Sequence, residues 1–105
     1  MIIVNKNEGT KIEYEVEGTK ITFDDDLSIK LAKREQDWPV HIDVCFDQDG
    51  ELVIGTAAGR AYVAEIDIPA RRYVTPEVEE GEEPEPPQPV PLDMDTVTLS
   101  LWAVE

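Results

Sequence analysis

The stretch from Val40 to Ile54 reads VHIDVCFDQDGELVI, and it predicts a β-hairpin. Its first half alternates apolar and polar residues, which places every second side chain on one face of a strand. The apolar set is Val40, Ile42, Val44 and Phe46. Pro39 stands at the start of this strand, where a missing N–H does least harm. The alternation therefore predicts a strand with one buried face.

The Asp-Gln-Asp-Gly run that ends at Gly50 predicts the turn of this hairpin. If Gly50 takes the left-handed position of a type I turn with a bulge, Phe46 faces Leu52. The next pair then opposes Val44 and Ile54, so apolar residues meet across both strands.

A second hairpin is predicted near the N-terminus. The segment Lys11–Glu17 alternates apolar and charged residues, as a half-buried antiparallel strand does. A two-residue turn at Glu17-Gly18 pairs Tyr14 with Ile21 and brings the apolar faces of both strands together. The stretch Leu27–Gln36 that follows is ambiguous, because its first residues alternate while its composition favours helix. The strand is preferred.

Two further strands are predicted on either side of a long connection. Arg60–Ile68 follows a turn and is expected to face inward with Tyr62, Ala64, Ile66 and Ile68. Asp95–Val104 alternates again and is expected to pair with the strand before the connection. Between them, Pro76–Pro91 contains six prolines and six glutamates, so burial cannot offset its ordering entropy. The sequence predicts one β domain over residues 1–105, interrupted by a flexible acidic proline-rich loop at 76–93.

Composition limits the classes of partner. The formal net charge is −15, and a field of that sign disfavours nucleic acid and anionic membrane surfaces. Cys45 is the only cysteine, so no intramolecular disulfide forms and a reducing cytosol fits the chain. The first residues offer no readable targeting signal. The expected location is the cytoplasm.

No catalytic, cofactor or metal site is predicted. With Gly50 as the sixth position of a calcium loop, the first and twelfth positions fall on Cys45 and Thr56, which lack the required carboxylates. His41 and Cys45 share a strand face with Asp43 but stand about 13 Å apart, too far for a base to take the thiol proton. An enzyme would require distant residues such as His41, Asp43 and Tyr73 to converge.

Four residues are candidates for binding a partner. Trp38 and Trp102 offer large rings for a protein or a glycan, although packing in the core or at its rim is the usual role of such side chains. Arg71 and Arg72 are adjacent cations that suit an acidic partner or the chain's own acidic loop.

The run from Ile42 to Arg71, IDVCFDQDGELVIGTAAGRAYVAEIDIPAR, together with the acidic proline loop and the closing TLSLW at Thr98–Trp102, resembles small prophage-type proteins of Gram-positive bacteria. This resemblance implies a role in virion assembly or host takeover, with incorporation into a phage particle as the alternative to the cytoplasm, and it brings no site residues with it.

The predicted fold is all-β, an antiparallel sandwich or partly open barrel of about seven to nine short strands. The predicted function is a non-enzymatic protein-interaction or structural module that binds a protein partner or itself. One alternative is an acidic inhibitor or nucleic-acid mimic that acts on a basic host protein. Another is a carbohydrate-binding module that uses Trp38 or Trp102.

Overall fold

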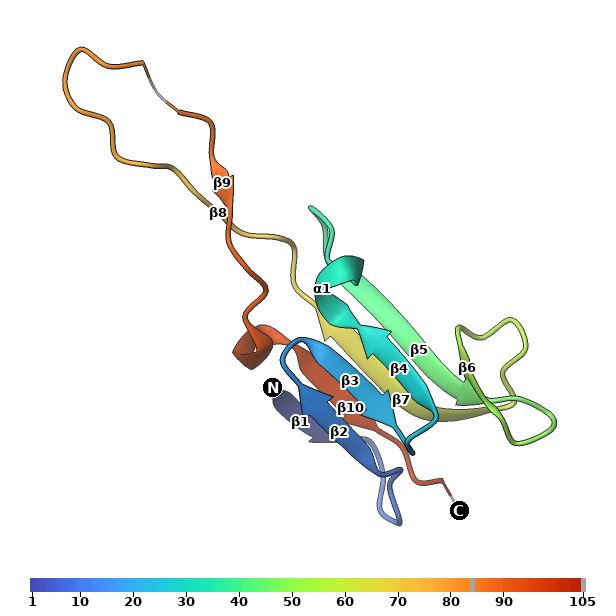
Figure 1. The fold of residues 1–105 in the computed structure, drawn as a ribbon. Coiled ribbons are helices and arrows are strands. Elements are labelled where there is room, and N and C mark those ends of the chain that lie inside the picture. Colours follow the sequence, from blue (N-terminus) through green and yellow to red (C-terminus); the bar gives the residue numbers. More distant parts are fainter. Residues whose placement is uncertain (84, 105) are drawn as a thin grey trace.

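The computed structural model describes residues 1–83 and 85–104, which form an all-β fold of two stacked sheets and a projecting arm (Figure 1). The larger sheet has five strands in the order β1 (Ile2–Asn5), β10 (Thr98–Leu101), β7 (Ala61–Ile68), β5 (Val40–Phe46) and β6 (Leu52–Ile54). The smaller sheet has three strands in the order β2 (Tyr14–Glu17), β3 (Lys20–Phe23) and β4 (Leu27–Lys30). The strands form an open sandwich, which confirms the predicted fold class.

Neighbouring strands are antiparallel except for the first pair. β1 runs parallel to β10, while β10 runs antiparallel to β7, as expected for a final strand that returns beside the strand before the long connection. The central contact is the long antiparallel pair of β5 and β7. The three-stranded sheet lies over one face of this five-stranded sheet (Figure 1).

One apolar core fills the space between the two sheets. Phe23 and Ile29 come from the smaller sheet and meet Ile66 and Leu99 from the larger one, and all four are at most 1% exposed. The burial of these side chains follows from the alternation of apolar and polar residues, because each strand turns one apolar face toward the other sheet. The opposite face of the larger sheet therefore stays outside the core.

The hairpin of β5 and β6 forms in the predicted register. Phe46 lies opposite Leu52 and Val44 opposite Ile54. Gly50 has a φ of 77°, in the left-handed region that the turn requires. The side chain of Asp47 stabilises the turn by accepting hydrogen bonds from the backbone N–H groups of Asp49 and Glu51. The acidic residue Asp47 therefore has a structural role in the turn.

The register of the first hairpin differs from the prediction by two residues. Tyr14 pairs with Phe23, and Glu17 pairs with Lys20, so the turn lies one residue later than Glu17-Gly18. Gly18 has a φ of 59° and occupies the first central position of this turn. A shift of two keeps every side chain on its face, so the alternation could not distinguish the two registers.

The ambiguous stretch Leu27–Gln36 contains both predicted structures. β4 occupies Leu27–Lys30, and the one-turn helix α1 occupies Leu31–Arg34. The preference for a strand is correct for the first part and wrong for the second. The helical turn begins at Leu31, whose backbone N–H donates to the carbonyl of Thr19 in the turn between β2 and β3. The side chain of Leu31 is fully buried, so it stays in the core although the chain leaves the sheet at this point.

Tyr62 does not face the core, contrary to the prediction. The register of β5 and β7 shifts between Val44 and Cys45, so that Val44 pairs with Ala64 and Cys45 with Tyr62. The extra residue of this bulge is Val63, which is buried in place of the tyrosine. Tyr62 is 41% exposed and lies on the outer face.

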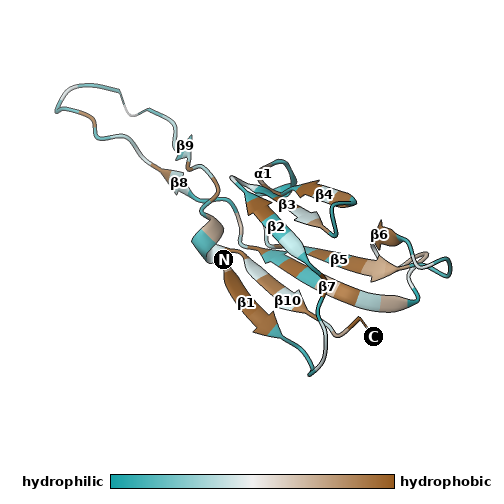
Figure 2. Ribbon diagram, turned by 60° about the horizontal axis from the view of Figure 1, so that its bottom comes forward, coloured by the Kyte–Doolittle hydropathy of each residue, from teal (hydrophilic) through white to brown (hydrophobic). Residues whose placement is uncertain are grey.

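The long connection forms an arm, defined here as residues 73–90. At the base of the arm, the two-residue strands β8 (Tyr73–Val74) and β9 (Gln88–Pro89) pair with each other. After the arm, the chain passes through the short 3-10 helix η1 (Met94–Thr96) into β10. None of the described arm residues is buried. The arm points away from the two sheets (Figure 1) and is mostly hydrophilic (Figure 2). Its predicted flexibility stays a prediction.

Among residues 1–83 and 85–104, no helix is long and apolar enough to cross a membrane.

Candidate functional site

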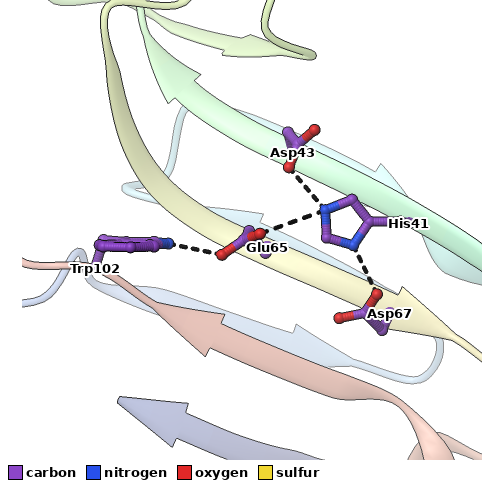
Figure 3. A network of polar contacts seen from close by, with 5 residues as sticks. All are labelled: His41, Asp43, Glu65, Asp67 and Trp102. Atoms are coloured by element: carbon purple, nitrogen blue, oxygen red, sulfur yellow. Dashed lines mark hydrogen bonds and ion pairs between the residues drawn. The ribbon is translucent and has the colours of Figure 1, made fainter. Parts of the chain in front are cut away.

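The outer face of the five-stranded sheet gathers polar side chains around one histidine. In the β5–β7 register, His41 lies opposite Asp67, and Asp43 lies opposite Glu65. All four alternate with the buried residues of their strands, so they project away from the core. We call these four residues the His41 cluster. It is drawn with its neighbour Trp102 in Figure 3.

Both nitrogens of the imidazole ring contact carboxylates. Nδ1 of His41 lies 2.6 Å from Oδ1 of Asp67, and Nε2 lies 2.8 Å from Oδ1 of Asp43. The same Nε2 lies 3.4 Å from Oε1 of Glu65. The ring is therefore held between two strands by three acidic side chains (Figure 3).

This surrounding negative charge favours the protonated imidazole. The hydrogen bond that His41 donates to Asp67 is the largest cause that raises the pKa of His41 above its ordinary value of 6.5, and Asp43 adds to it, while partial burial opposes the shift. The side chain of His41 is 46% exposed, so solvent screens these contacts.

An aromatic pair borders the cluster. The indole N–H of Trp102 donates to Oε2 of Glu65 at 2.8 Å, which fixes the orientation of that carboxylate. The ring of Trp102 also stacks on Tyr62, with the ring centroids 5.7 Å apart. Trp102 thus packs at the rim on the outer face of its sheet, as its position on the less apolar side of the strand suggested.

The cluster does not supply a cysteine nucleophile. Burial, together with the nearby charges of Asp43 and Glu65, raises the pKa of Cys45, so the reactive thiolate is disfavoured. Tyr73 does not join His41 and Asp43 either, because its hydroxyl donates to Asp37 at 2.5 Å. The convergence that an enzyme of this type would need is therefore absent from these residues.

A second surface is basic. A groove of about 750 Å³ runs between β4 and β5, with Lys30, Lys33 and Arg34 on one wall and Trp38 beside them. We call it the basic groove, and His41 and Asp43 border it on the β5 side. Within the described part of the chain, none of its three cations forms an ion pair.

Two strand edges line this groove. Among the described residues, β4 pairs with β3 alone, so its other edge is free. β6 pairs with β5 from Val44 to Phe46, and the N–H of Gly55 donates to the carbonyl of Asp43, so within the described part of the chain the stretch 40–42 has no strand partner on that side. Free edges of this kind present backbone N–H and C=O groups to an extended peptide.

The four predicted partner-binding residues lie in three separate places. Trp38 is 62% exposed in the basic groove, and Trp102 borders the His41 cluster. Arg71 contacts Glu35 and Asp37 at the base of the arm. Arg72 contacts Asp93, a residue of the acidic loop. The two arginines thus have partners within the chain, and their binding to another molecule stays a prediction.

Sequence reasoning missed the acidic half of the His41 cluster. Glu65 and Asp67 are the polar positions of a strand whose apolar positions were used to predict the core. Pairing that strand with Val40–Phe46 would have revealed the cluster, but their register depends on the bulge near Cys45. The groove lysines belong to the ambiguous stretch Leu27–Gln36, for which a strand is the preferred prediction, and no local pattern places them opposite β5.

No protein-family profile, no curated protein and no solved structure matches this chain.

Proposed function

We propose that the protein is a non-enzymatic structural module that associates with itself by placing the acidic arm of one copy in the basic groove of the next. The observation that supports this proposal is the separation of charge between two exposed surfaces. The arm contains six glutamates and no lysine or arginine. The groove contains three cations without ion-pair partners among the described residues.

The charges of the two surfaces are complementary. The chain has only nine basic residues and a net charge of −15, yet three of the nine gather in this groove. An exposed cationic surface on such a protein attracts acidic segments and repels other cations. Every further copy of the chain carries such an acidic segment, namely its glutamate-rich arm.

The shape of the chain favours contact between copies. The arm extends away from the sheets (Figure 1), so its tip lies far from β4 and β5, the strands that line the groove of its own copy. Prolines restrict the backbone before binding, so this segment loses less conformational entropy on binding than a proline-free loop of the same length, and Trp38 offers the aromatic surface on which such segments pack. The free edges of β4 and β5 add backbone partners for those arm residues that have an N–H.

A contact between two different surfaces is heterologous, and it builds rings or filaments when it repeats. Such assembly agrees with the role in virion assembly that the resemblance to prophage-type proteins implies. In the alternative function, an acidic inhibitor, the same arm binds a basic host protein. Self-association is required by the proposed function and not by the inhibitor, so the oligomeric state distinguishes the two.

The test is sedimentation velocity at low and high salt. One variant replaces residues 75–87 with Asn-Gly, which joins the paired residues Val74 and Gln88 by a short turn. The other is Lys33→Glu with Arg34→Glu, which reverses the groove charge. Each variant alone is expected to be monomeric, whereas wild type forms salt-sensitive oligomers.

Mixing the two variants provides the matched control. The armless variant keeps an intact groove and the charge-reversed variant keeps an intact arm, so the mixture is expected to form heterodimers that grow no further. A monomeric wild type, or variants that still form oligomers on their own, would contradict the proposed association.

A further inference from the structure

We propose that His41, Asp43 and Glu65 form a binding site for a divalent transition metal ion on the outer face of the five-stranded sheet. The inference goes beyond the proposed function, because the pairing of the acidic arm with Lys30, Lys33 and Arg34 needs no metal ion, although His41 and Asp43 also border the basic groove. One donor atom from each of these residues lies within 4.8 Å of the other two. Figure 3 shows the three side chains converging from β5 and β7.

The donor atoms have the spacing of a small coordination sphere. Nε2 of His41 lies 2.8 Å from Oδ1 of Asp43 and 3.4 Å from Oε1 of Glu65. Ligand atoms that each lie about 2.1 Å from a tetrahedral ion are roughly 3.4 Å apart. An ion that replaces the proton on Nε2 therefore requires Asp43 to move outward, while Glu65 already lies at that separation from the ring.

Neighbouring groups orient two of the three ligands. Asp67 accepts a hydrogen bond from Nδ1 of His41, which directs Nε2 toward the other carboxylates. Trp102 donates to Oε2 of Glu65, which leaves Oε1 facing the imidazole. A carboxylate behind the histidine and a donor behind the acidic ligand are the supporting contacts that metal sites commonly have.

The charge of the cluster also favours a dication. Three carboxylates surround one imidazole, so even a protonated His41 leaves two negative charges uncompensated. In residues 1–83 and 85–104, no lysine or arginine pairs with Asp43, Glu65 or Asp67. A divalent ion in place of the proton lowers this repulsion.

The ligand types indicate which metals fit. An imidazole with two carboxylates suits Zn²⁺ or Mn²⁺, whereas Ca²⁺ and Mg²⁺ prefer shells made entirely of oxygen. Three protein ligands leave at least one coordination position open to water or to a group from another molecule. The site is partly exposed, so an ion can enter without a rearrangement of the sheet.

Nuclear magnetic resonance of the imidazole tests this site in the intact protein. His41 is the only histidine, so every ring signal belongs to it. After treatment with a chelator, one equivalent of Zn²⁺ is expected to shift the Nε2 resonance and to leave the Nδ1–H bonded to Asp67 in place. Ring signals that do not move in excess Zn²⁺ would overturn the proposal, whether or not any variant folds.

Calorimetric titration with Zn²⁺ then tests the individual residues. His41→Ala is expected to abolish binding at this site. Asp67→Asn keeps all three ligands and is expected to weaken the affinity by about 10- to 100-fold. Asp49→Asn removes the same charge from the β5–β6 turn and is the matched control, with unchanged affinity expected. Equal affinity in wild type and His41→Ala, or tighter binding of Ca²⁺ than of Zn²⁺, would refute the site.

Discussion

Strand β7 presents two unlike surfaces that alternate residue by residue. Its inner side chains Ile66 and Ile68 are at most 1% exposed and lie in the core. Its outer side chains Glu65 and Asp67 contact one imidazole and one indole. The inner residues are stabilised by the removal of apolar surface from water, which any neighbour of suitable shape provides. The outer residues depend on particular partners at particular atoms.

The two faces are therefore expected to respond differently to substitution. Changes on the inner face are expected to reduce global stability, because they leave a cavity. Changes on the outer face are expected to have small effects on stability and larger effects on binding, since exposed ion pairs contribute little to folding. The predictions below test this contrast, from the largest expected effect on stability to the smallest.

Ile66→Ala is expected to lower the free energy of unfolding by about 2–5 kcal/mol, because Ile66 is fully buried between the sheets. Urea unfolding followed by circular dichroism measures the change. The control is Asp67→Ala, one residue further along the same strand, with an expected loss below about 1 kcal/mol. Equal losses for the two variants would remove the distinction between the faces.

Trp102→Phe is expected to lower the free energy of unfolding by about 1 kcal/mol. Phenylalanine keeps an aromatic ring for stacking on Tyr62 but cannot donate to Glu65. The same urea titration measures the loss. In a Glu65→Gln background the substitution should cost less, because the hydrogen bond to a charged acceptor is already gone. An unchanged cost in that background would show that the indole contributes through packing alone.

Stability should fall as pH rises through the folded-state pKa of His41. That pKa is raised above 6.5, chiefly by Asp67, so the folded state holds the proton more tightly than the unfolded state. The gain is complete below the unfolded-state value and disappears at higher pH. Because the ring is partly exposed, the gain is expected to stay below about 1 kcal/mol, the upper end for exposed ion pairs. Unfolding curves of wild type and His41→Gln in chelator, between about pH 6 and pH 9, should converge at the upper end.

Replacing residues 75–87 with Asn-Gly is expected to change the free energy of unfolding by less than about 0.5 kcal/mol. The described part of the arm has no buried residue, so its removal takes nothing from the core. Calorimetric melting should stay cooperative with nearly the same midpoint. A large fall in the midpoint would show that the arm packs on the sheets.

Local patterns predicted much of the sandwich. The β5–β6 register was predictable because the turn residues and both apolar faces agree on one arrangement. The β2–β3 register was not, since two turns around Gly18 preserve the same faces. The helical turn at Leu31–Arg34 and the outward position of Tyr62 depend on a change of sheet and on a bulge. Neither feature has a strong signal within a window of a few residues.

Period-two alternation and composition are local properties, so the sequence alone predicted most of the side chains that face the core, with Tyr62 as an exception, and predicted that residues 76–91 add little to it. It also placed His41 and Asp43 on one face of their strand. The packing of distant strands brings Glu65 and Asp67 into the His41 cluster and sets Lys30, Lys33 and Arg34 opposite β5 across a groove. Those neighbours depend on strand order and register, which arise when distant segments pack together and cannot be read from either segment alone.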